Sequence, residues 1–123
     1  MENEIKQLVD TVRQTGFEAH AYLRSGHLEK IYENALRNWL RKRGLEVEQQ
    51  SPIKVYDEDG SLLGDMVADL IVEQRVIVEL KAVRALAPEH TAQVLGYLRA
   101  TGFKHGMLLN FGAPRYEARK LIL

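Results

Sequence analysis

The sequence has 123 residues, 46% hydrophobic and 28% charged, and its 17 basic and 17 acidic side chains give a formal net charge of zero. A chain of this length can bury one core without metal or disulfide support, so residues 1–123 are expected to form one domain. The lack of cysteine excludes disulfides, catalytic thiolates and cysteine zinc sites. The N-terminus is acidic, which argues against a secretory signal, and no apolar run approaches the roughly 18 residues of a membrane span. A cytoplasmic protein is therefore expected.

Charge is unevenly distributed along the chain. Residues 46–79 contain nine acidic side chains against Lys54 and Arg75, whereas residues 99–123 contain five basic side chains against Glu117. An acidic centre followed by a basic end suits a cation site that must also hold a polyanion, although charges scattered over a solvated surface would give the same pattern. The zero net charge argues against a simple basic nucleic-acid binder.

Two amphipathic helices are predicted in the first third of the chain. Apolar residues at helical spacing predict a helix over residues 4–24, loosened near Gly16. A second helix is predicted over about residues 28–43, with Ser25 as a candidate N-cap and Gly44 ending it after three basic residues. Its predicted apolar stripe consists of Ile31, Ala35, Leu36, Trp39 and Leu40.

Three strands are predicted to follow. Residues 46–56 form the first, in which Pro52 favours an edge position because it cannot donate to a ladder. The turn-forming residues 57–60 join it to a second strand over residues 62–72. The apolar run Val76–Val78, rich in β-branched residues and too short for a buried helix, indicates a third.

Acidic and basic residues interrupt the second and third predicted strands. Asp69 lies on the second strand, and Glu79 and Lys81 lie on the third. Such side chains are costly inside a sheet unless they are paired or bind a metal, and two carboxylates suit Mg²⁺ or Mn²⁺. Lys81 shares a face with Glu79 because the side-chain period of a strand is two.

The length of the loop between these strands decides whether the carboxylates can meet. A two-residue loop, Glu73-Gln74, would pair Asp69 with Val78 and leave Glu79 on the opposite face. A three-residue loop that includes Arg75 would pair Asp69 with Glu79 directly. A shared metal site therefore requires the longer loop, or a bulge.

The last third of the chain is predicted to return to the sheet through a helix. Pro88 suits the first turn of a helix that extends to Gly102 and places Gln93 and Tyr97 on one face. Residues 106–111 form a buried strand, parallel to the third because a helix connects the two. Residues 115–123 are expected to close the chain as a short strand or helix.

The spacing Asp69-x9-Glu79-x-Lys81 resembles the active-site signature of the PD-(D/E)XK nuclease superfamily, with Ala68 in place of the usual proline. The resemblance implies an α/β, restriction-endonuclease-like core in which a central mixed β-sheet is flanked by helices. It implies that Asp69, Glu79 and the backbone carbonyl of Leu80 hold the metal. Gln93-x-x-x-Tyr97 further resembles a motif of RecB-type nucleases, which implies that this pair positions the substrate.

A second motif, Gly26-x-x-Glu29-x-x-Tyr32, resembles the one that names the GxxExxY protein family, a branch of the same superfamily. The likeness continues to the segment 110–112. By this resemblance Glu29 would be a catalytic residue that completes the metal site or binds a second ion, although a glutamate favoured by the helix dipole would also begin a helix. Tyr32 would orient Glu29 or fill the helix–sheet interface, and so help to position the substrate.

Together these features predict a metal-dependent nuclease that hydrolyses phosphodiester bonds in nucleic acid, with DNA favoured over RNA and Mg²⁺ or Mn²⁺ as the cofactor. Catalysis is assigned to Glu29, Asp69, Glu79 and Lys81. Two alternatives remain open. One is a nuclease-fold module that binds nucleic acid or supports a partner without cutting. The other is a junction-resolvase-like nuclease, which would act as a homodimer.

Overall fold

The computed structural model describes residues 2–123, which form three helices and five strands. In chain order these are α1 (Glu2–Leu23), α2 (Glu29–Lys42), β1 (Val47–Tyr56), β2 (Leu62–Val72), β3 (Val76–Lys81), α3 (Pro88–Thr101), β4 (His105–Asn110) and β5 (Glu117–Ile122). The strands form one sheet in the order β1-β2-β3-β4-β5. Every neighbouring pair is antiparallel except β3 and β4, which are parallel.

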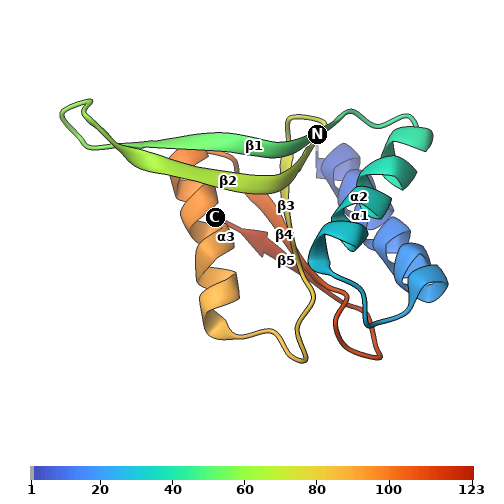
Figure 1. The fold of residues 1–123 in the computed structure, drawn as a ribbon. Coiled ribbons are helices and arrows are strands. Elements are labelled where there is room, and N and C mark those ends of the chain that lie inside the picture. Colours follow the sequence, from blue (N-terminus) through green and yellow to red (C-terminus); the bar gives the residue numbers. More distant parts are fainter. Residues whose placement is uncertain (1) are drawn as a thin grey trace.

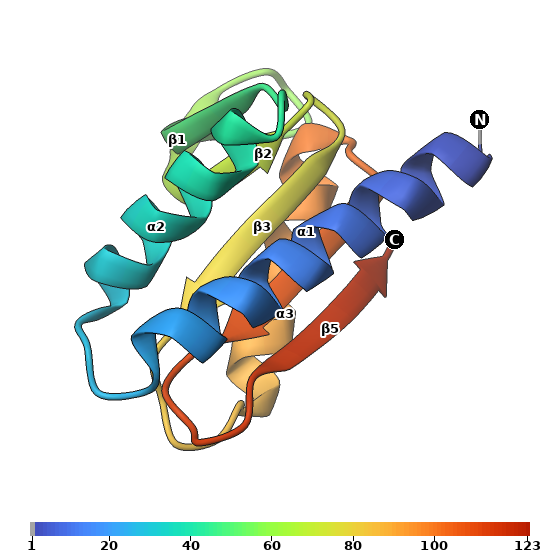
Figure 2. The ribbon, with the colours of Figure 1, turned by 90° about the vertical axis from the view of Figure 1, so that its right-hand side faces the viewer.

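Helices cover both faces of this sheet. Helices α1 and α2 lie side by side on one face, and α3, which connects β3 to β4, covers the other (Figures 1 and 2). One core forms beneath α1 and α2 and includes Val76, Val78 and Leu80 of β3. A smaller core forms beneath α3 and includes Ile77. Residues of β3 therefore alternate between the cores, which places Glu79 and Lys81 on the α3 face.

Helix α1 follows the predicted amphipathic pattern but runs straight through Gly16. A Cβ added at Gly16 would lie 2.2 Å from the hydroxyl oxygen of Tyr116, which precedes β5. That oxygen is buried and has no hydrogen-bond partner within residues 2–123. Gly16 therefore lets the helix and the Tyr116 ring approach each other, and it does not loosen the helix.

Helix α2 begins later than its predicted cap. The N-cap position is Leu28, without a side-chain hydrogen bond, so the prediction of Ser25 as the cap is wrong. Its buried residues are Tyr32, Glu33, Leu36 and Leu40. Ile31, predicted on the buried stripe, is 42% exposed. The buried face of α2 is rotated relative to the predicted apolar stripe. It includes Glu33, which a hydropathy pattern assigns to the surface.

The remaining elements match their predicted positions closely. β2 has the predicted bounds, β1 is the edge strand that Pro52 favours, and the last segment is a strand. At the end of β4 the buried Asn110 side chain accepts hydrogen bonds from the backbone N–H groups of Val83 and Gly112, at 3.0 and 3.1 Å. Asn110 thereby ties the β3–α3 loop to the β4–β5 loop. The five-stranded mixed sheet with helices on both faces is the restriction-endonuclease-like arrangement that the sequence predicted. No helix within residues 2–123 is long and apolar enough to cross a membrane.

Replacing Gly16 by alanine tests the contact between α1 and Tyr116. Glycine-to-alanine changes inside helices commonly stabilise by about 0.5–1 kcal/mol. Gly16→Ala is expected to lower the free energy of unfolding instead, by about 1–3 kcal/mol, because the added methyl overpacks against the ring. Urea denaturation measures the change.

Gly96 on α3 is the matched control, because a Cβ there would meet no atom within 4 Å. Gly96→Ala is expected to hold or raise the stability by up to about 1 kcal/mol. Equal effects of the two substitutions would contradict the close approach of Tyr116.

Candidate active site

Asp69 and Glu79 lie side by side on β2 and β3. The strands are joined by the three-residue loop that the metal hypothesis requires, and Leu70 pairs with Val78. The backbone N–H of Asp69 donates to Oε1 of Glu79 at 3.1 Å, and the N–H of Leu80 donates to Oδ2 of Asp69 at 2.9 Å. The two carboxylates thus continue the ladder where the regular pairing of the strands ends. Both side chains are buried.

Asp69 occupies a point where β2 changes the face that its side chains cover. Ala68 and Leu70 would share a face in a regular strand, but Ala68 packs beneath α3 and Leu70 beneath α1 and α2. In the paired strand β1 the same change separates Val47 from Ile53. This local twist places a carboxylate within the sheet, between the two helical layers.

The Lys81 side chain contacts Gln93 of α3, which the sequence patterns suggested as a substrate-positioning residue. Its Nζ donates to Oε1 of Gln93 at 2.9 Å and lies 4.0 Å from Oε2 of Glu79. Tyr97, one turn after Gln93, is buried, and burial together with the charges of Glu79 and Asp69 raises the pKa of its hydroxyl to about 12. Tyr97 therefore stays a neutral hydrogen-bond donor at physiological pH.

Glu29 and Tyr32 occupy different environments on α2. Glu29 is exposed at the start of the helix, and its carboxylate makes no hydrogen bond or ion pair within residues 2–123. Partial burial and the nearby charge of Asp69 raise its pKa, so it lies near the pair without contacting it. Tyr32 is fully buried, so it is placed to support the fold and cannot touch a substrate. Its hydroxyl donates to the carbonyl of Arg24 and accepts from the N–H of His27 at 3.2 Å, which fixes the α1–α2 loop.

The site contains two residues that the sequence patterns did not identify. Glu33 of α2 is buried and binds Lys30 at 3.0 Å. Gln50 of β1 donates from Nε2 to both oxygens of Glu33, at 3.0 and 3.1 Å, and to Oδ1 of Asp69 at 3.2 Å. Glu33 follows Glu29 by four residues and shares its helix side, which is a signal that could have been used. No comparable signal marks Gln50.

Gln50 is held in an unusual backbone conformation. Its φ angle is 52°, in the left-handed region that costs a non-glycine residue about 1 kcal/mol or more. It lies where β1 changes faces, between Gln49, which pairs with Leu70, and Ser51, which pairs with Ala68. The strained backbone of Gln50 therefore lies at the twist of the β1–β2 ribbon, where the Gln50 side chain contacts Asp69.

A model of the PD-(D/E)XK nuclease superfamily matches residues 6–121. The chain belongs to the PD-(D/E)XK nuclease superfamily. Among solved structures it is similar to one titled "Crystal structure of SSO0001", with a TM-score of 0.58 and 17% sequence identity over 76% of this chain and 48% of that chain. The chain thus spans about half of that structure, and the likeness concerns the fold alone. No curated protein matches the sequence.

Asp69, Glu79 and Lys81 keep the spacing of the PD-(D/E)XK signature, with Ala68 before the aspartate, and their assignment as its active-site residues stays a prediction. The narrower assignment to the GxxExxY family stays a prediction. Glu29 of its motif lies near the acidic pair, whereas Tyr32 and Gly26, whose φ angle is 111°, shape the preceding loop.

The donor atoms of this PD-(D/E)XK site fit a hard divalent cation. Burial and the charge of Asp69 raise the pKa of Glu79 to about 8, and burial raises the pKa of Asp69 despite its hydrogen bond from Leu80. Ionising both buried carboxylates together is unfavourable, and a bound cation would stabilise their ionised forms. Within residues 2–123 no three Asp, Glu or His side chains converge as a preformed metal cluster, so a backbone carbonyl or bound water would have to complete the coordination.

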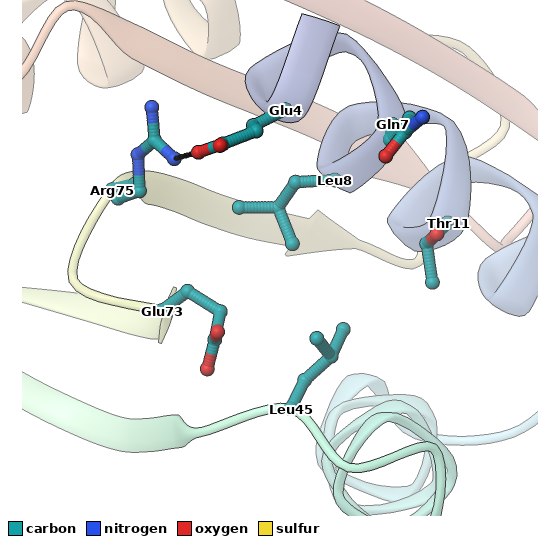
Figure 3. A pocket seen from close by; sticks show the side chains of 7 residues that line it. All are labelled: Glu4, Gln7, Leu8, Thr11, Leu45, Glu73 and Arg75. Carbon is teal, nitrogen blue, oxygen red and sulfur yellow. Dashed lines mark ion pairs between the residues drawn. The ribbon is translucent and has the colours of Figure 1, made fainter. Parts of the chain in front are cut away.

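A cavity of about 340 Å³ at the other end of β3 does not belong to this site (Figure 3). It lies between α1 and the β2–β3 loop, and Arg75 at its rim pairs with Glu4 at 3.5 Å. Glu73, also in its lining, accepts the N–H of Glu46 at 2.6 Å. The charged groups at its rim are therefore engaged with the protein itself.

The raised pKa of Glu79 gives a pH dependence to the stability of the metal-free protein. The stabilisation that protonated Glu79 contributes is fully present below its ordinary pKa of 4.5 and is lost as pH rises through the folded value of about 8. In EDTA the free energy of unfolding is expected to fall over this interval by at least about 1 kcal/mol. Urea denaturation from pH 5 to 8.5 measures it.

Glu79→Gln is expected to flatten this pH dependence. Glu58→Gln, in the exposed β1–β2 turn, serves as the control and should keep the wild-type slope. Saturating Mn²⁺ should oppose the fall in the wild type, since the cation favours the ionised carboxylates. A wild-type stability that rises between pH 5 and 8 in EDTA would contradict a protonated Glu79.

Proposed function

We propose that this protein is a divalent-cation-dependent nuclease that hydrolyses phosphodiester bonds, with DNA favoured as the substrate. The observation that carries this proposal is the buried Asp69–Glu79 pair with Lys81 beside it. Superfamily membership supports nuclease chemistry in general. The ion, the preference for DNA, and a cytoplasmic location remain parts of the proposal.

Asp69, Glu79 and the carbonyl of Leu80 would hold the cation, Mg²⁺ or Mn²⁺. The carbonyl of Lys81 accepts a hydrogen bond from Phe111, so it points toward β4. Carbonyls of successive strand residues point to opposite edges, and that of Leu80 therefore points toward Asp69 on the β2 side, where the Leu80 N–H also points. When bound, the cation would lower the pKa of a water and neutralise charge on the phosphate. Glu29, exposed at the start of α2 and near Asp69, would assist as a third carboxylate.

Lys81 would orient the attacking water or stabilise the charge that develops on the phosphate. Its hydrogen bond to Gln93 restricts a side chain that is otherwise flexible, and it leaves other N–H donors for a substrate. Gln93 and the neutral hydroxyl of Tyr97 supply further hydrogen-bonding groups on the same face. They would position the strand that is cut.

Glu33 and Gln50 would act as positioning residues. Gln50 connects the buried Glu33 to Oδ1 of Asp69. Held by Gln50 on one oxygen and by the N–H of Leu80 on the other, the Asp69 carboxylate has a fixed orientation toward Glu79. Such support is how a second layer of hydrogen bonds sharpens a metal site.

The two alternatives make different demands on this site. A non-cleaving module has no need for a lysine held beside two buried carboxylates, so Lys81 favours the enzyme. A junction resolvase would need a homodimer with two symmetric sites, and a sedimentation measurement that finds only monomers would remove that alternative.

Asp69→Asn separates an enzyme from a binding module. The substitution keeps the shape of the side chain but removes a charge that the cation requires, so cleavage of single-stranded and duplex DNA with Mg²⁺ or Mn²⁺ is expected to fall at least about 100-fold. In EDTA the variant should bind DNA as tightly as the wild type or more tightly, because a negative charge near the phosphate is gone. Gel cleavage assays and fluorescence anisotropy measure the two properties.

Asp65→Asn is the matched control on the same strand, because Asp65 is exposed and its carboxylate lies 3.8 Å from Nζ of Lys54, away from Glu79. It should cleave like the wild type. If the wild type cleaves neither DNA nor RNA with any divalent cation, or if Asp69→Asn retains full cleavage, the proposed mechanism is wrong. Thermal unfolding of each variant checks that it is folded.

A further inference from the structure

The arginines of this fold divide into two groups. Within residues 2–123, six make side-chain hydrogen bonds or ion pairs with the protein, namely Arg13, Arg37, Arg41, Arg43, Arg75 and Arg119. The other four, Arg24, Arg84, Arg99 and Arg115, make none within these residues and are exposed. A guanidinium without a protein partner is available to bind phosphate.

Three of the four unpaired arginines lie in loops at one end of the sheet. Arg24 lies between α1 and α2, Arg84 between β3 and α3, and Arg115 between β4 and β5. Because β3 and β4 are parallel, both end here, and Figure 2 shows the α1–α2 loop beside them. Lys81 ends β3 and Glu29 begins α2, so the three arginine loops and the candidate active site lie at the same end of the sheet.

A cavity of about 390 Å³ lies between two of these loops, next to the end of α1. Phe17, Ala21, Pro114 and Tyr116 form its apolar wall, and Arg24 and Arg115 lie at its polar side. The Phe17 ring is 54% exposed and packs edge-on against Tyr116, with ring centroids 6.3 Å apart. His20, which also lines the cavity, is engaged with the carbonyl of Ala113 at 2.9 Å.

We propose that this cavity binds an unpaired nucleotide of the substrate strand, with the base against Phe17 and the phosphates against Arg24 and Arg115. The inference rests on the proposed nuclease function and names its substrate class as a single strand or a single-stranded overhang. A base can reach an aromatic side chain only when it is unpaired, and such stacking together with arginines is how proteins bind single strands.

The position of the cavity fits a strand that continues into the active site. Arg24 precedes Glu29 by five residues, which limits the distance between their Cα atoms to about 18 Å. A single strand spans that distance with a few nucleotides. The Tyr32 hydroxyl donates to the backbone carbonyl of Arg24. This hydrogen bond links helix α2, which carries Glu29, to the backbone of the arginine at the cavity.

Binding of a 12-nucleotide oligo(dT) in EDTA tests the inference without requiring cleavage. The double variant Arg24→Gln/Arg115→Gln is expected to bind at least about tenfold more weakly. The slope of log K against log salt concentration should fall by about 1.4 in magnitude, about 0.7 for each phosphate contact to a single strand. Phe17→Ala should weaken binding by about tenfold with an unchanged salt slope, because it removes stacking only.

Arg99→Gln is the matched control, since Arg99 is also unpaired but lies on α3. It should change the affinity less than twofold. A blunt 12-base-pair duplex should bind more weakly than oligo(dT) and be insensitive to Phe17→Ala. Wild-type-like binding of oligo(dT) by the double variant and by Phe17→Ala would overturn the inference, as would equal or tighter binding of the duplex. If the expected losses occur but the wild type cleaves nothing, the nuclease proposal fails and the single-strand site stands.

Discussion

Two carboxylates lie buried side by side on adjacent strands, and much of the surrounding structure serves to make this possible. Burial raises the pKa of both carboxyl groups, and the nearby charge of Glu33 adds to this at Asp69 as the charge of Asp69 does at Glu79. Each carboxylate accepts a backbone N–H of the neighbouring strand in place of a regular ladder bond. The sheet thereby provides hydrogen bonds for the pair, and Lys81 is its nearest cationic side chain within residues 2–123, so two carboxylates face one ammonium group and a bound cation would be favoured.

The support for the pair comes from both helical layers. From one side, Gln50 connects Asp69 to Glu33 on α2, and its left-handed backbone conformation coincides with the change of faces in the β1–β2 ribbon. From the other side, Gln93 on α3 holds Lys81 next to Glu79. A strained residue and a buried charge would each be destabilising alone, and their occurrence together indicates that the local structure is determined by the site.

Local sequence signals were sufficient for most of the fold. The length of the β2–β3 loop decides the register, and the metal-site hypothesis required the three-residue loop that the structure has. The i,i+4 spacing on α3 placed Gln93 and Tyr97 on one face, and the resemblance to the RecB-type motif implied that this face lies beside the site, where Gln93 contacts Lys81. Side-chain periodicity within regular elements shows which residues share a face, and these hypotheses supplied the rest.

Features that depend on long-range packing could not be read in this way. Glu33 is buried because Gln49 and Gln50 of β1 satisfy it, a partnership between residues 16 and 17 positions apart. Helix α2 begins after Leu28 and not at Ser25, and its buried face includes Glu33. Gly16 suggested a weak point in α1, yet its role is set by Tyr116 at the far end of the chain. Family resemblance pointed to Asp69, Glu79, Lys81 and Gln93, but not to Glu33 and Gln50, whose hydrogen bonds extend from α2 to Asp69.

The most direct test of this account is to locate a bound cation. Crystals soaked in Mn²⁺ should show an anomalous peak about 2.0–2.4 Å from an oxygen of both Asp69 and Glu79, with the carbonyl of Leu80 as a third ligand. A peak at other residues, or none at a Mn²⁺ concentration that supports cleavage, would contradict the claim that this buried pair is the metal site.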